Sequence, residues 1–173
     1  MPPQLVVGSV TITAAEEDEL PSDVDAVVLE EDTYRVLSAD AKISDSDEDL
    51  EELLKEAIKD GGAVLGSVLV TGEQPIRLLA IVHDLNEEPS WREEWVSKAL
   101  DGIFLEATNR KLTSLAMPLL GTVHGAMATE RSVVLLSRAL KVASLTHLEH
   151  IYLIVPSGTN QEIVEILGSQ VEK

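Results

Sequence analysis

The stretch MPLLGTVHGAMATERS, residues 117–132, joins an apolar run to a helical pattern. The apolar run ends at Pro118, and the helical pattern begins near Thr129. Gly121 and Gly125 lie between them, and glycine lets backbone amides approach a ligand closely. A helix start adds a partial positive charge, which favours an anion. The stretch therefore predicts either a phosphate-binding loop or a plain turn between a strand and a helix.

The spacing of the glycines distinguishes this stretch from the common nucleotide motifs. No Gly-Lys-Ser or Gly-Lys-Thr follows the strand, so the stretch is not a Walker loop. The glycines are also spaced differently from the dinucleotide-binding fingerprint. Both interpretations of the stretch therefore stay open on spacing alone.

Hydrophobic periodicity places further elements around this stretch. We expect strands over Gln4–Thr13, Val24–Leu29, Ala63–Thr71, Ile76–His83, Leu112–Pro118 and His150–Val155. We expect helices over Asp47–Asp60, from Ser90 to about residue 110, over Thr129–Ala143 and over Thr159–Leu167. Alternating strands and helices in the second half indicate a parallel sheet covered on both faces, and a hairpin over 63–83 makes the sheet mixed. The predicted fold is a three-layer α/β/α sandwich with a mixed, mostly parallel central sheet. It forms one domain over 1–173, with an acidic irregular segment at about 30–46.

Two predicted helices begin with a capping-box pattern. Ser90 with Glu93, and Thr159 with Glu162, have the spacing in which each side chain bonds the other residue's backbone. In the first of these helices, the period places Trp91 and Trp95 on the apolar face, so we expect both in the core.

Composition excludes several functions. The formal net charge is −18, and residues 14–60 hold 18 acidic and 4 basic residues. Such a surface repels nucleic acid, so we expect no DNA or RNA partner. There is no cysteine, which excludes disulfides and thiolate chemistry. No apolar run reaches the roughly 18 residues of a membrane span, and the first residues lack a signal-peptide pattern, so we expect a cytoplasmic protein with no membrane partner.

Few side chains have the spacing of a catalytic or metal site. His83 and Asp84 form either an acid–base pair or a strand end with the histidine packed beneath a loop. His124 lies in the glycine-containing stretch, where it could contact a phosphate or act as an acid. His147 and His150 lack the accompanying carboxylates of a metal site. We therefore expect no catalytic residue, no metal and no cofactor.

The longer segment SLAMPLLGTVHGAMATERSVVLLSRAL, residues 114–140, resembles the phosphate loop and following helix of macro domains. The order of elements is similar as well, from VDAVV at 24–28 through LLAIVHDL at 78–85. In that family the amides of this loop hold the diphosphate of ADP-ribose. The resemblance implies ADP-ribose or a related adenine nucleotide as ligand. It implies a phosphate loop made of Gly121, Thr122, Val123, His124, Gly125 and Ala126.

Other positions depart from the family's pattern. The family has glycine where this chain has Val123, and often also at Ala126; valine stiffens the backbone there and adds bulk. An aspartate that pairs with adenine in the family is replaced by Ser9. The asparagine and glycine-rich loop after the buried strand are replaced by LEEDTYRVLSADAKISDS, residues 29–46, whose first acids would repel an anionic ligand. The resemblance implies further ligand contacts in the cleft from Ser9, Glu30, His83, Ser157 and Gly158.

Three functions are consistent with these observations. The first is a macro-domain-like module that binds ADP-ribose or a related adenine nucleotide through the loop at 121–126. The second is a degenerate macro fold that no longer binds nucleotide and acts as a protein-interaction or regulatory module through its acidic half. The third is an ADP-ribosyl hydrolase, against which the missing asparagine and glycine loop argue.

Overall fold

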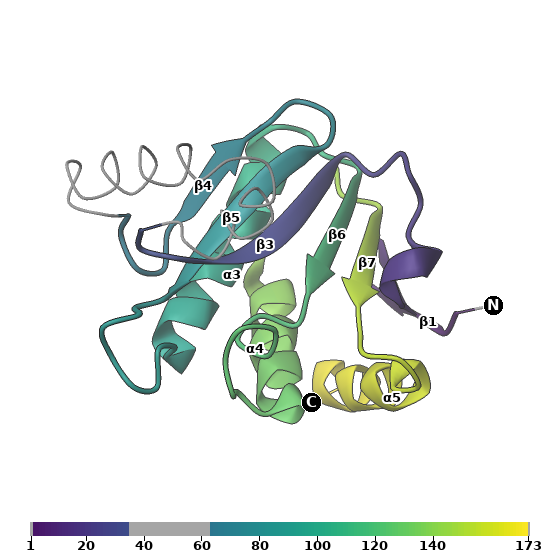
Figure 1. Cartoon of the computed structure of the whole chain (residues 1–173). Coiled ribbons are helices and arrows are strands. Elements are labelled where there is room, and N and C mark those ends of the chain that lie inside the picture. The colour runs from purple at the N-terminus through teal and green to yellow at the C-terminus, as the bar shows by residue number, and fades with distance from the viewer. Residues whose placement is uncertain (1, 35–62, 173) are drawn as a thin grey trace.

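The computed structural model describes residues 2–34 and 63–172. Their strands form one seven-stranded sheet in the order β1-β2-β7-β6-β3-β5-β4 (Figure 1). The strands are β1 (Gln4–Val7), β2 (Val10–Ala15), β3 (Ala26–Asp32), β4 (Val68–Thr71), β5 (Ile76–His83), β6 (Ser114–Pro118) and β7 (His150–Ile154). The five central strands run parallel, whereas the edge strands β1 and β4 are antiparallel to their neighbours. The sheet is therefore mixed and mostly parallel, as the sequence predicts.

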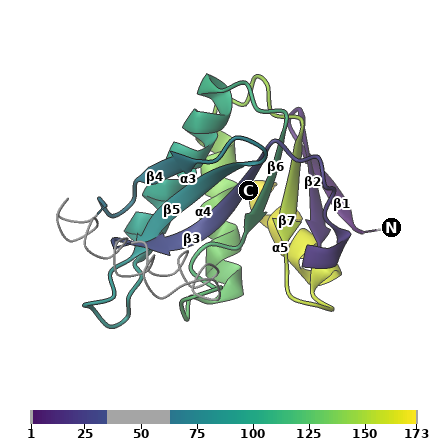
Figure 2. The ribbon, with the colours of Figure 1, turned by 45° about the horizontal axis from the view of Figure 1, so that its top comes forward.

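Three α-helices cover the sheet in this part of the chain. They are α3 (Glu93–Asn109), α4 (Thr129–Val142) and α5 (Asn160–Val171), and a short 3-10 helix, η1 (Glu17–Glu19), follows β2. Because α4 packs against both α3 and α5, the three lie on one face of the sheet (Figure 2). The arrangement is an α/β sandwich. The helix predicted over Asp47–Asp60 lies outside the described residues.

The core is aliphatic. Its largest fully buried side chains come from the inner strands, the inward helix faces and the loop after β6: Ile12, Leu78, Ile81, Leu100, Ile103, Leu115, Met117, Leu120, Ile151, Leu153, Ile163 and Leu167. Trp91 is partly buried and packs against this core, but it precedes α3 and forms a backbone bridge with His83. Trp95 is half-buried, with the Arg92 guanidinium 5.0 Å from its ring centre. Among the described residues, no helix is long and apolar enough to cross a membrane.

Two strand predictions are corrected by the structure. The run Gln4–Thr13 is a hairpin rather than one strand, because Gly8 takes a positive φ of 62° and the chain reverses between Val7 and Val10. The alternation of β-branched residues continues on both sides of this turn, so periodicity alone does not show it. The strand β3 continues to Asp32, so residues 30–32 belong to the sheet and not to the irregular segment predicted at 30–46. The rest of that segment from residue 35 lies outside the described residues.

Neither predicted capping box forms. The N-cap of α3 is Arg92, and the Ser90 hydroxyl is hydrogen-bonded to the His83 ring instead. At α5, the Thr159 hydroxyl donates to the carbonyl of Pro156 at 2.6 Å. The pattern gives the N-cap of α5 correctly but places the start of α3 two residues early, and other hydrogen-bond partners compete for the same hydroxyls.

Candidate ligand-binding site

The loop between β6 and α4, residues 119–128, is a closed turn held by its own backbone. The Thr122 amide and hydroxyl both donate to the carbonyl of Leu119, and the Met127 amide donates to the carbonyl of Gly121. Gly121 has a φ of 90°, a conformation that side chains rarely adopt. A Cβ at Gly121 would also lie 2.9 Å from the sulfur of Met127. This glycine is therefore required by the turn itself.

Gly125 is required by packing. A Cβ there would lie 2.5 Å from Trp91 Cδ1, 2.6 Å from the Gly121 carbonyl oxygen and 3.1 Å from His83 Cε1. All three distances are shorter than an ordinary van der Waals contact. The backbone at Gly125 thus rests directly on the side chains beneath the loop. Gly121 and Gly125 are therefore both explained by the conformation and packing of the loop itself.

Glu30 lies beneath the same loop and is hydrogen-bonded to it. This side chain is buried, although it is the first of three successive acids in the last part of β3. Its Oε2 accepts from the Val123 amide at 2.9 Å, and its Oε1 accepts from the His124 amide at 3.4 Å. Two amides of the predicted phosphate loop therefore point at a carboxylate of the protein.

His83 completes this buried group. The side chains of His83 and Glu30 are both fully buried, and His83 Nε2 lies 2.6 Å from Glu30 Oε1. His83 Nδ1 lies 2.9 Å from the Ser90 hydroxyl. Because both ring nitrogens are used, the ring does not pair with Asp84, whose carboxylate accepts from the Asn86 amide. The acid–base pair His83–Asp84 is therefore absent, and the histidine is packed beneath the loop.

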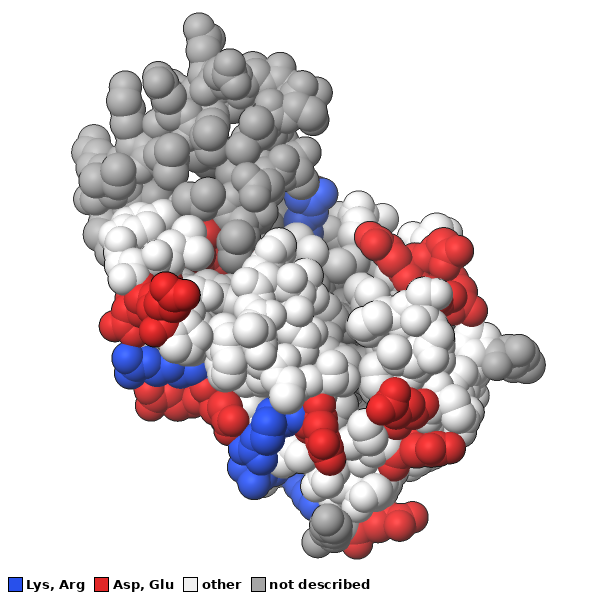
Figure 3. All heavy atoms as spheres, turned by 60° about the horizontal axis from the view of Figure 1, so that its bottom comes forward, with Lys and Arg blue, Asp and Glu red and all other residues white. Residues whose placement is uncertain are grey.

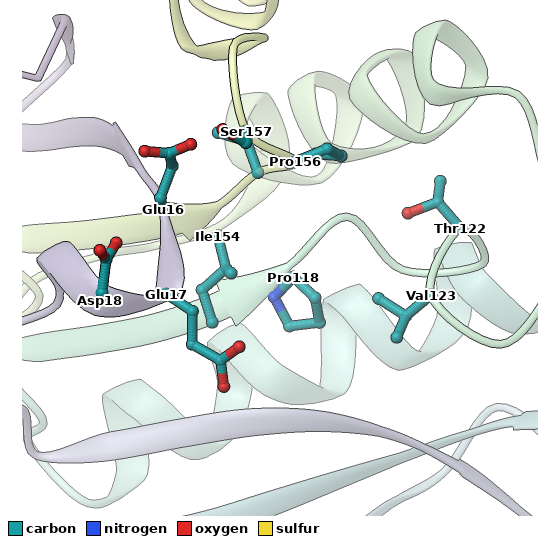
Figure 4. Close-up of a pocket in the computed structure, with 10 residues that line it drawn as sticks. Glu16, Glu17, Asp18, Pro118, Thr122, Val123, Ile154, Pro156 and Ser157 are labelled. Carbon is teal, nitrogen blue, oxygen red and sulfur yellow. The ribbon is translucent and has the colours of Figure 1, made fainter.

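A cavity of about 630 Å³ opens beside the loop, at the carboxyl ends of β2, β6 and β7. It is lined by Glu16, Glu17, Asp18, Pro118, Thr122, Val123, Ile154, Val155, Pro156 and Ser157. In Figure 4, Thr122 and Val123 lie on one side of Pro118, and Glu16 and Ser157 on the other. Carboxyl ends of parallel strands are the usual place for ligands in α/β folds.

One end of the cavity is strongly acidic. Glu16, Glu17 and Asp18 follow β2 directly, and no Lys or Arg is among the described residues that line the cavity. The face drawn in Figure 3 shows acidic side chains, with some basic ones among them, around a mostly uncharged centre. Carboxylates of Glu16, Asp18 and Glu19 lie within 4.8 Å of one another, but they are exposed or half-buried, as acidic clusters without metal commonly are. The sequence does not predict these cavity residues, because residues 14–23 fall between two expected strands and carry no motif.

The structure brings together some of the predicted site residues and separates others. Thr122, Val123 and Ser157 line the cavity, and Gly158 lies in the same turn with a φ of 82°. The Val123 side chain is 56 % exposed and borders the cavity, so a valine adds bulk there as the sequence predicts. The other predicted residues of the loop are Gly121, His124, Gly125 and Ala126, and Glu30 and His83 lie beneath it.

His124 and Ser9 do not line this cavity. The His124 side chain is exposed, and its ring lies edge-on to His83 with 6.4 Å between centres. Ser9 lies in the β1–β2 turn, before β2 begins its pairing with the start of β7 at His150. The loop and the cavity lie at the carboxyl ends of the parallel strands, whereas Ser9 lies at the amino end of β2, so its predicted placement in the cleft is wrong. The residue that follows the carboxyl end of β2 is Glu16.

Comparison with solved structures identifies the fold. A macrodomain of Oceanobacillus iheyensis with MES bound superposes with a TM-score of 0.74 at 13% identity, covering 99% of this chain and 98% of that one. A point mutant of the same macrodomain with ADPR gives 0.72 at 14% identity, with both chains covered in full at 100%. The macrodomain of Thermus aquaticus DarG gives 0.62 at 18% identity, covering 84% of this chain and 97% of that one. No family model and no curated protein matches the sequence.

The chain therefore has the macrodomain fold, as the order of its elements predicted. At sequence identities of 13–18%, the similarity to these structures establishes the fold alone. Function has to be argued from the residues of this chain's own site.

Proposed function

We propose that this chain is a ligand-binding module that takes an adenine nucleotide of the ADP-ribose class, or its nucleoside part, in the cavity between the loop at 121–126 and the turn at 155–158. The observation that carries the proposal is the cavity itself. Its volume of about 630 Å³ lies within the range of roughly 300–1,000 Å³ that small-molecule sites occupy. It opens where the macro fold brings together the ends of three parallel strands.

The lining offers a matching set of contacts for a nucleoside. Pro118, Ile154 and Val155 provide an apolar surface on which a base can lie. Carboxylates accept hydrogen bonds from an exocyclic amino group, and Glu16 and Glu17 supply them at one end. The hydroxyls of Thr122 and Ser157 are of the kind that bonds a ribose. Solved structures of the same fold described as "with ADPR" and "with ADP" support a nucleotide as the ligand class.

Isothermal titration of the protein with adenosine and with ADP-ribose tests the proposal, with inosine, which lacks the exocyclic amino group, as a base control. We expect saturable binding of at least one adenine compound and weaker binding of inosine. The variant Ser157→Trp places an indole in the cavity from an exposed turn and is expected to abolish binding. Its matched control is Gln161→Trp, at an exposed position on α5 outside the cavity. No heat with either adenine compound at millimolar concentration would reject the proposal.

A second function is favoured by a separate observation. Glu30 occupies amides of the predicted phosphate loop, which is what a macro fold that no longer binds nucleotide would show. Such a module would act through protein contacts, and a basic partner would complement the acidic residues after β2. Absence of adenine binding together with salt-sensitive binding of a basic protein partner would favour this second function.

A further inference from the structure

Glu30 is in the position that an anion would take on the loop. Its two oxygens accept from consecutive backbone amides, those of Val123 and His124, at 2.9 and 3.4 Å. Consecutive amides that converge on one point form an anion-binding concavity. A carboxylate and a phosphate offer such amides the same acceptor oxygens. In this chain a side chain of the protein itself, the Glu30 carboxylate, therefore occupies the position that an anion would take on the loop.

The carboxylate is also fixed in place. Its side chain is fully buried, and His83 Nε2 contacts it at 2.6 Å from below the loop. The Ser90 hydroxyl in turn contacts the other ring nitrogen of His83. For a phosphate to reach the two amides, Glu30 would have to leave both of them and His83. Moving a charged group out of a buried, fully hydrogen-bonded position is unfavourable.

The cavity does not compensate for added negative charge. Its described lining contains three acidic side chains, Glu16, Glu17 and Asp18, and no basic one. A diphosphate beside the loop would meet the Glu30 carboxylate on one side and these acids on the other. Like charges within a few ångströms repel each other, most strongly where water is excluded.

We propose that Glu30 is a specificity-determining residue, whose carboxylate occupies the Val123 and His124 amides and restricts the cavity to ligands that place no phosphate there. The favoured ligand class is then an uncharged nucleoside and not a nucleoside diphosphate. This inference rests on the proposed function for the choice of adenine compounds. The exclusion of an anion from the loop can be tested independently of that function.

Inorganic pyrophosphate is the probe, titrated into 15N-labelled full-length protein. In the wild type we expect no saturable shift of the Val123 and His124 amide signals. The variant Glu30→Ala uncovers both amides, and we expect these signals to shift with an affinity at least roughly tenfold above that of the wild type, which is about 1.4 kcal/mol. Glu130→Gln, in the first turn of α4, removes one exposed negative charge near the loop without touching these amides, and it is the matched control.

The outcomes separate the inference from its alternatives. Equal pyrophosphate affinity in the wild type and Glu30→Ala would overturn it, and so would an equal gain in Glu130→Gln, which would indicate a general charge effect. If Glu30→Ala does not fold, Glu30→Ser shortens the side chain so that it no longer reaches both amides; failure of the folded variant to gain affinity also overturns the inference. In wild-type protein, adenosine is expected to bind at least as tightly as ADP-ribose, and tenfold tighter ADP-ribose binding would contradict the inference. Absence of binding by both would reject the proposed function and leave the pyrophosphate result to decide the role of Glu30.

Discussion

Replacing Gly125 with alanine tests whether this glycine serves packing or ligand approach. The added Cβ would lie 2.5 Å from Trp91 Cδ1 and 2.6 Å from the Gly121 carbonyl oxygen. Gly125 is not among the glycines with a positive φ, so crowding is the sole strain expected from the substitution. One of the crowded atoms belongs to the backbone and cannot rotate away. Overpacking of this kind costs about 1–3 kcal/mol, and at this chain length each kcal/mol lowers Tm by about 2–4 °C.

Urea denaturation followed by tryptophan fluorescence measures this effect, because Trp91 lies against the substituted position. Gly168→Ala is the matched control. Gly168 lies in α5, where a Cβ would meet only Leu5 at 3.8 Å. We expect the Gly168→Ala protein to be more stable than the wild type by about 0.5–1 kcal/mol. A Gly125→Ala protein as stable as the wild type would refute the packing argument. In that case, close approach of a ligand to the backbone would be the remaining explanation for a glycine at position 125.

Three further substitutions test other contacts. Asp25 accepts from the Thr113 amide and hydroxyl and from the Ser114 amide, and these bonds, the Thr113 amide first, hold its pKa below the ordinary 3.8. Its stabilisation is therefore complete above the unfolded-state pKa and is lost as pH falls through the lower folded-state pKa. We expect Asp25→Asn to cost about 1–3 kcal/mol at pH 7 and much less at pH 2, and an equal loss in urea melts at both pH values would contradict this. Ser90→Ala leaves His83 Nδ1 buried without its partner, so thermal unfolding should show a loss of about 1–3 kcal/mol, and an unchanged Tm would argue against the contact. Glu93→Gln weakens the partly exposed pair with Arg131, and we expect only a slight loss of stability in urea melts that shrinks further in salt; a large, salt-independent loss would be inconsistent with a surface pair.

The sequence predicts the framework of the molecule well because its signals are local. The apolar run Ile76–His83 matches β5 residue for residue. The helix expected at Thr129 begins there in the structure. In both cases the period, the end signal and the neighbouring turn agree, so tertiary contacts did not have to be known.

The site was less predictable because its contacts join remote residues. Glu30 bonds His83, which is 53 positions away, and Val123, which is 93 positions away. From the sequence, Glu30 is one of three successive acids, and such runs are usually solvated. The burial of this carboxylate depends on three strands ending side by side, which no local pattern reveals. Ser9 was misplaced for a related reason, because the hairpin turn hides within a continuous β pattern.

The Glu30 carboxylate occupies the Val123 and His124 amides of the loop at 121–126. Amide hydrogen exchange at these two residues, measured by NMR in the wild type and in Glu30→Ala, tests this arrangement most directly. We expect both amides to be protected in the wild type and to exchange at least about tenfold faster in the variant, because each amide then loses the buried carboxylate oxygen to which it donates. Rapid exchange of both amides in the wild type, or equal protection in the variant, would contradict the account.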